Sequence, residues 1–243
     1  MSVARLLSAT ETLEAPRIFE RSAKLSRGRM STERGLVSMD KRALYPGPKS
    51  TLRDVCAALG CPDTSPLEPF LSQASAVHFG ADDNIGKCYL EFAPQDAPEP
   101  NLVFLALKWR GDAQLLNRYV SVSAQAHADK AGLVRTLVPD PVVADVMQRS
   151  LDLARDSDPD GQAVVLHVTE DGSARASVDI SVADAKASLR DATEILLPLK
   201  AFHGCDLRPF LDEQADARFG HIAAGQSSDG ATFVTVYFGA QAI

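Results

Sequence analysis

The sequence predicts an α+β protein with about ten antiparallel strands in consecutive hairpins and helices between most of them. Two observations carry this prediction. Many short segments alternate between apolar and polar residues, which is the period of a β-strand. In addition, residues 67–80 recur without gaps as residues 207–220, with the same residue at six of the 14 positions. These observations predict a series of hairpins that includes a repeated unit.

Alternating segments rich in β-branched and aromatic residues mark the strands. Glycine-containing turns separate several of them, as at Gly111, Gly172 and Gly230, which favours tight antiparallel hairpins. The predicted strands cover residues 18–27, 35–43, 76–82, 86–93, 102–110, 117–124, 162–169, 173–182, 217–225 and 231–239.

Helical periodicity predicts helices over residues 50–59, 66–74, 128–156, 183–201 and 206–214. The long segment 128–156 contains Pro139 and Pro141, so it must break or kink there, because proline lacks the backbone donor and clashes with the preceding turn. Residues 93–100 are predicted to be a linker without a helix.

The repeat organises the chain. Its two copies share a Leu-x-Pro-Phe-Leu segment followed by Phe-Gly, and we expect Gly80 and Gly220 to serve backbone geometry as a bulge or a tight strand start. The prediction is a single domain over residues 1–243 with an internal repeat at approximately 35–92 and 173–239. Ten strands favour a closed barrel with its helices outside, or a strongly curved sheet. Two α/β sandwiches of about 120 residues each are the alternative.

Composition narrows the class of protein. The net charge of −7 over 243 residues argues against nucleic-acid binding, and no apolar run approaches the length of a membrane helix. The N-terminal segment carries three glutamates and is a poor signal peptide. Four cysteines without a CxxC pair, and five histidines without a ligand motif, indicate neither disulfides nor a metal site. We expect a cytoplasmic protein whose partner is a small molecule.

The strand alternation also predicts a second, polar face. Cations, tyrosines and small hydroxyl side chains share this face, and Lys24 extends it on the first strand. If the sheet closes, the face lines a lumen suited to an anionic ligand; if it stays open, the face is exposed to solvent. His78 and its counterpart in the repeat, Arg218, could both face a ligand or both lie at the rim, and we expect the rim. Members of the polar face that could contact a ligand are Lys87, Tyr89, Glu91, Lys108, Arg110, Tyr119, His167, Arg175, Asp179 and Tyr237.

The element order and one motif resemble the aromatic prenyltransferases of the ABBA, or PT-barrel, class. Lys87-Cys88-Tyr89 is similar to the Lys-x-Tyr pairs with which that family holds and shields an allylic diphosphate. The last predicted strand keeps the tyrosine, Tyr237, but has Thr235 in place of the lysine. The resemblance implies a closed ten-stranded barrel and transfer of an isoprenoid group to an aromatic acceptor.

The resemblance also implies roles for the polar face. Lys87, Lys108 and Arg175 would bind the diphosphate, and Tyr89, Tyr119 and Tyr237 would shield the allylic cation. Glu91 or Asp179 would accept the proton of the acceptor, while Arg110 and His167 would contribute to substrate binding. No cofactor is predicted, and no aspartate-rich run supports a magnesium–diphosphate site.

Two other functions fit the same sequence. A duplicated helix-plus-hairpin unit could form a non-catalytic protein that binds a small molecule or assembles with other copies. An enzyme of another pathway could use the same lumen for a different anionic substrate.

Overall fold

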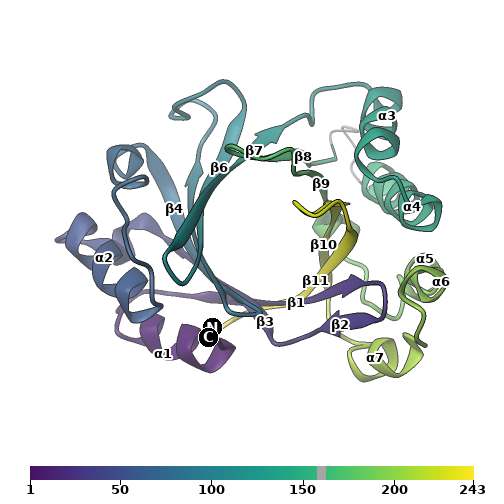
Figure 1. Cartoon of the computed structure of the whole chain (residues 1–243), viewed down its shortest axis with the longest axis horizontal. Coiled ribbons are helices and arrows are strands. Elements are labelled where there is room, and N and C mark those ends of the chain that lie inside the picture. The colour runs from purple at the N-terminus through teal and green to yellow at the C-terminus, as the bar shows by residue number, and fades with distance from the viewer. Residues whose placement is uncertain (158–162) are drawn as a thin grey trace.

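The computed structural model describes residues 1–157 and 163–243. Its strands form one antiparallel sheet that closes on itself, because β1 pairs with both β3 and β11. Figure 1 looks along this barrel and shows the helices outside it. The strands are β1 (Ile18–Ser26), β2 (Arg29–Ser31), β3 (Arg34–Asp40), β4 (Ala74–Asp82), β5 (Ile85–Phe92), β6 (Leu102–Arg110), β7 (Ala113–Ser121), β8 (Val165–Glu170), β9 (Ala176–Ser181), β10 (Phe219–Gln226) and β11 (Thr232–Ala242).

Ten of these strands form the closed barrel, as predicted, and β2 is an addition. The first half of β1 pairs with β3, whereas its second half, Lys24 to Ser26, pairs with the three residues of β2. The barrel excludes both the open sheet and the two-sandwich arrangement. Residue 162, at which the predicted strand 162–169 begins, lies outside the described residues.

The helices differ more from the prediction than the strands do. The break at Pro139 and Pro141 is confirmed, since one helix ends at Leu137 and the next begins at Pro141. Residues 183–201 are not one helix but short turns of helix, and residues 66–74 contain only a 3₁₀ turn. The helices are α1 (Val3–Glu11), α2 (Pro48–Ala58), α3 (His127–Leu137), α4 (Pro141–Ser157), α5 (Thr193–Leu196), α6 (Leu199–His203) and α7 (Arg208–Glu213), with 3₁₀ turns at η1 (Lys41–Leu44), η2 (Glu68–Phe70) and η3 (Ala183–Ala185).

The apolar core lies between the barrel and its helices rather than inside the barrel. One cluster packs beneath α1 and α2 and includes Phe79; a second packs beneath α3 to α7 and includes Phe219. Both phenylalanines are fully buried. Strand β5 shows why the sheet has two faces, because its residues alternate between buried and half-buried along its whole length. The polar face is consequently turned inward.

The two copies of the repeat occupy comparable places in the barrel. Each leads into a hairpin, β4–β5 or β10–β11. A Gly-Cys pair precedes each copy, at residues 60–61 and 204–205, and both glycines have positive φ, 81° at Gly60 and 88° at Gly204. Gly220 lies at a shift in the register between β10 and β11, as expected for a bulge. The triplet Leu-Arg-Asp also occurs upstream of each copy, at residues 52–54 and 189–191, but the first lies in α2 and the second precedes α5. Common origin of the two copies stays a prediction.

In the part of the chain that the structure describes, no helix has both the length and the apolar character needed to cross a bilayer.

Candidate active site in the barrel lumen

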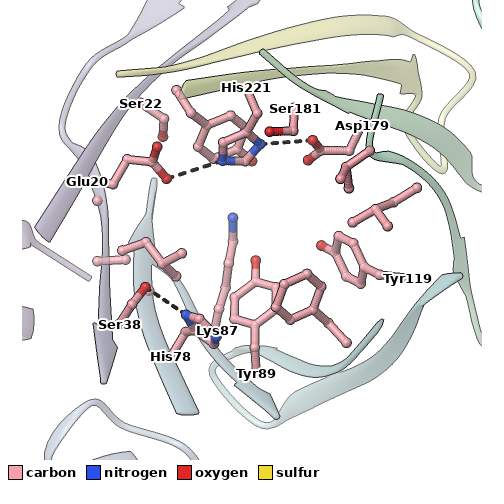
Figure 2. A pocket seen from close by; sticks show the side chains of 18 residues that line it. Glu20, Ser22, Ser38, His78, Lys87, Tyr89, Tyr119, Asp179, Ser181 and His221 are labelled. Carbon is pink, nitrogen blue, oxygen red and sulfur yellow. Dashed lines mark hydrogen bonds and ion pairs between the residues drawn. The ribbon is translucent and has the colours of Figure 1, made fainter. Parts of the chain in front are cut away.

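The lumen contains a cavity of about 320 Å³ whose two ends differ in charge. One end lies near the hairpin turns, where β4 ends at Asp82 and β6 ends at Arg110. The other end lies near the segments that connect successive hairpins through the helices. We call the first the hairpin end and the second the helix end of the lumen. Side chains from strands on all sides of the barrel meet in this cavity (Figure 2). A closed lumen of this size can enclose a small molecule.

The hairpin end gathers positive charge around a buried carboxylate. Asp82 forms ion pairs with Arg34 and with Lys87, whose Nζ lies 2.9 Å from Asp82 Oδ2. Lys87 stands directly across from Lys108 in the β5–β6 ladder. Figure 2 shows the ammonium group of Lys87 pointing into the cavity. Arg34 and Lys87 therefore share one carboxylate, and Lys108 adds a further positive charge beside them.

Lys24 and Arg175 extend the same cluster on the other side of the lumen. Arg175 lies 3.2 Å from Glu170, the second buried carboxylate at this end. Burial and the positive charges of Arg34 and Arg175 lower the pKa of Lys24 to about 8. We call Lys24, Arg34, Lys87, Lys108 and Arg175 the cation cluster; it has Asp82 and Glu170 as buried counter-ions.

The lysines of the cation cluster destabilise one another. Burial, followed by the charges of Arg34 and Lys24, holds the pKa of Lys87 well below its usual value. Burial and the charges of Arg175 and Lys87 have the same effect on the pKa of Lys108. Because a bound anion would remove this repulsion, the cation cluster is suited to an anionic group.

Aromatic rings form the middle of the lumen. The rings of Tyr89 and Tyr119 meet edge to face with centroids 5.7 Å apart, and Phe104 lies 5.9 Å from Tyr119. Burial raises the pKa of Tyr119 to about 12, so its phenol stays neutral. The Nζ of Lys108 lies 5.8 Å from the centre of the Tyr119 ring. These rings can surround an apolar or cationic group next to the cation cluster.

At the helix end, His221 is held between two carboxylates. Its Nδ1 lies 2.9 Å from Asp179 Oδ1 and its Nε2 lies 3.2 Å from Glu20 Oε2 (Figure 2). Burial alone would lower the pKa of His221, but the charges of Asp179 and Glu20 outweigh it and raise the pKa to about 10. The resulting imidazolium stacks on Tyr237 with centroids 3.7 Å apart.

A second imidazole lies on another wall of the lumen. His78 contacts Ser38 Oγ through Nδ1, at 2.7 Å, and Glu91 Oε2 through Nε2, at 2.9 Å. The expectation that His78 is a rim residue is therefore wrong. Its counterpart Arg218 is at the rim, where it is exposed and donates a hydrogen bond to the carbonyl of Ala183.

The structure brings most of the predicted site residues together. Lys87, Tyr89, Tyr119, Asp179 and Tyr237 line the cavity. Lys108 and Arg175 lie beside it in the cation cluster, and Glu91 reaches it through His78. Their roles stay predictions.

Two predicted site residues lie elsewhere. His167 is on the outer face of β8, because the cavity is lined by Leu166 and the register pairs His167 with the core residue Val178. Our assignment of faces on this strand was wrong. Arg110 ends β6 at a hairpin turn and is exposed, away from the cavity.

Several lumen residues were not among the predicted ones. Glu20 and Ser22 lie on β1 and Arg34 lies on β3. On these two strands the sequence analysis assigns only Lys24 to the polar face. His221 was treated as an isolated histidine, since its acidic partners are 42 and 201 residues away. A search for polar residues spaced by two along β1 would have found Glu20, Ser22 and Lys24 together.

Within residues 1–157 and 163–243, no three histidine, cysteine, aspartate or glutamate side chains are arranged to hold a metal ion.

Comparisons with known proteins identify the fold. No family model and no curated protein matches the sequence. Among solved structures, 5-dimethylallyltryptophan synthase from Streptomyces coelicolor superposes with a TM-score of 0.63 at 15% identity, over 90% of this chain and 80% of that one. AnaPT from Neosartorya fischeri gives a TM-score of 0.58 at 13% identity, over 90% and 77% of the two chains.

The NotF prenyltransferase is a third similar structure, with a TM-score of 0.56 at 12% identity over 90% of this chain and 80% of that one. NotF has also been solved in complex with brevianamide F and DMSPP. All three are ABBA-type aromatic prenyltransferases. The chain described here therefore has the PT-barrel fold, as its resemblance to that class predicted.

Proposed function

We propose that the protein transfers an isoprenoid group from an allylic diphosphate to an aromatic small-molecule acceptor. The observation that carries this proposal is the cation cluster at one end of the barrel lumen, directly next to the aromatic rings of Tyr89 and Tyr119. The fold, which the protein has in common with prenyltransferases, supports the same reaction class.

The cation cluster would bind the diphosphate. Lys87 and Lys108 face each other across one ladder position, and Arg34 reaches the same region through Asp82. Their positive charge would stabilise the diphosphate as it leaves with the electron pair of the broken carbon–oxygen bond. Protein cations thus supply charge stabilisation at the departing oxygen.

The aromatic middle of the lumen would hold the allylic carbon. Tyr89, Tyr119 and Phe104 would stabilise the developing allylic cation through their ring faces and exclude water from it. The ring carbon of the acceptor would then form the new bond to the allylic carbon. The remaining step is removal of one proton from that ring carbon.

Two carboxylates are candidates to accept this proton. Asp179 lines the cavity but already forms an ion pair with His221, whereas Glu91 is hydrogen-bonded to His78. Loss of turnover with retained donor binding in Glu91→Gln, but not in Asp179→Asn, would assign the proton to Glu91, and the opposite result to Asp179. Equal turnover of both variants and the wild type would exclude both.

The first experiment is a thermal-shift titration with dimethylallyl, geranyl and farnesyl diphosphates and with inorganic pyrophosphate. We expect stabilisation of the wild type by at least one diphosphate and its loss in Lys87→Ala. Lys200→Ala, an exposed lysine on α6, is the matched control and should respond like the wild type.

A second measurement separates catalysis from binding. Mass spectrometry of mixtures with a panel of aromatic acceptors should reveal products heavier by the isoprenoid unit. Binding of diphosphates without any product would favour the non-catalytic small-molecule-binding protein. Failure of every diphosphate and of pyrophosphate to stabilise the wild type would exclude the proposed donor site.

A further inference from the structure

The helix end of the lumen carries more acidic than basic groups. Glu20, Asp179 and Glu91 come from three strands, and their ion-pair partners in the described part of the chain are the imidazoles of His221 and His78. Three carboxylates face two imidazoles, so negative charge remains even if both imidazoles are protonated. The helix end is therefore opposite in sign to the cation cluster.

Burial makes this excess charge effective. The side chains of Glu20 and Asp179 are 14% and 11% exposed, and both line the cavity. Each gives one oxygen to His221. Water is largely excluded at such sites, so charges there are screened less than on the surface.

The opposite charges at the two ends of the lumen therefore favour one orientation of any molecule that spans it. An anionic group is attracted to the cation cluster, and the aromatic rings occupy the middle. A group at the far end meets Glu20 and Asp179, which repel a carboxylate and accept hydrogen bonds from a nitrogen donor. Glu91 adds negative charge from behind His78.

We propose that the acceptor carries an ammonium group or another nitrogen donor, and no carboxylate, on the part that faces Glu20 and Asp179. This inference rests on the proposed function, because it assigns the helix end of the lumen to the acceptor. It predicts selection between acceptors of the same ring and opposite charge.

Three ligands with one ring test this selection by isothermal titration calorimetry at pH 7: tryptamine, 3-ethylindole and indole-3-acetate. We expect tryptamine to bind at least about tenfold more tightly than indole-3-acetate, with 3-ethylindole between them. In Glu20→Gln, and separately in Glu91→Gln, the ratio of the two dissociation constants should fall about threefold or more. Glu194→Gln, an exposed glutamate on α5, should leave it unchanged.

The inference is overturned if the wild type binds indole-3-acetate as tightly as tryptamine, if none of the three ligands binds, or if both carboxylate variants keep the wild-type ratio. Pyrophosphate binding is measured on the same preparations. Stabilisation by pyrophosphate together with equal binding of the two charged indoles would refute the acceptor class while leaving the donor site intact. Absence of pyrophosphate binding would instead count against the proposed function itself.

Discussion

Replacing His221 with glutamine tests the charge arrangement at the helix end of the lumen. The substitution removes the imidazolium and leaves Asp179 and Glu20 facing each other across a partly buried space. A carboxylate pair without its cation is repulsive, so we expect the variant to be less stable than the wild type.

The magnitude follows from the pKa of His221. Its rise from 6.5 to about 10 corresponds to an upper bound of roughly 5 kcal/mol, at about 1.4 kcal/mol for each pKa unit. Because the imidazole is about a quarter exposed and coupled to two acids, we expect about 2–4 kcal/mol of destabilisation at pH 6.

The sign of the pH dependence is fixed by the same shift. The folded protein keeps the proton on His221 up to about pH 10, whereas the unfolded chain loses it near pH 6.5. The stabilisation is therefore complete below pH 6.5 and declines as the pH rises toward 10. The difference in unfolding free energy between the wild type and His221→Gln should shrink over that range.

Urea denaturation followed by the fluorescence of Trp109, the single tryptophan, measures this difference. His167→Gln, on the outer face of β8, is the control and should show no comparable loss between pH 6 and 10. If the difference in unfolding free energy between the wild type and His221→Gln stays constant or grows with pH, His221 is not held in its protonated form by Asp179 and Glu20.

The other predictions concern the cation cluster and the core. Asp82→Asn removes the carboxylate between Arg34 and Lys87, so it should lower the free energy of unfolding by about 2–4 kcal/mol in urea titrations. The same change should tighten pyrophosphate binding in calorimetry, and weaker binding would contradict the assignment of the cation cluster as the diphosphate site. Since Lys24 loses its charge as the pH rises through about 8, pyrophosphate affinity should decline across pH 7–9, and a flat profile in the wild type would argue against its participation. Phe219→Ala should cost about 3–5 kcal/mol, because the ring is fully buried, and a cost below about 1 kcal/mol in urea denaturation would be inconsistent with that packing.

The barrel was predictable because its hairpins are local. Glycine-containing turns at Gly111, Gly172 and Gly230 all adopt positive φ, and each joins two strands whose alternation is visible in the sequence. Lys87 and Tyr89 were found for the same reason, since residues two apart on a strand share a face.

The assignment of His167 failed because its strand offers no contrast between faces. Val164 and Leu166 line the cavity, while Val165 and Val178 belong to the core on the other side. With apolar residues on both faces, the single histidine was taken to mark the lumen. Only the pairing of β8 with β9 settles which face is which.

Long-range pairing explains the other omissions. The clamp on His221 joins residues 42 and 201 positions apart, and the Arg34–Asp82 pair joins β3 to β4. No local sequence pattern predicts such long-range contacts. Helix α1 was also missed, although it buries Leu6 against the barrel, because a nine-residue amphipathic segment gives little periodic signal.

The seam between β1 and β11 has a consequence for how the chain folds. Ala23 pairs with Val236, so closure must wait until almost the whole chain is present. Until then β1 and β10 each leave an edge open to other chains during synthesis. A truncation that ends at Gln226 would retain nine barrel strands but keep both edges, and we expect it to aggregate rather than form a smaller soluble barrel.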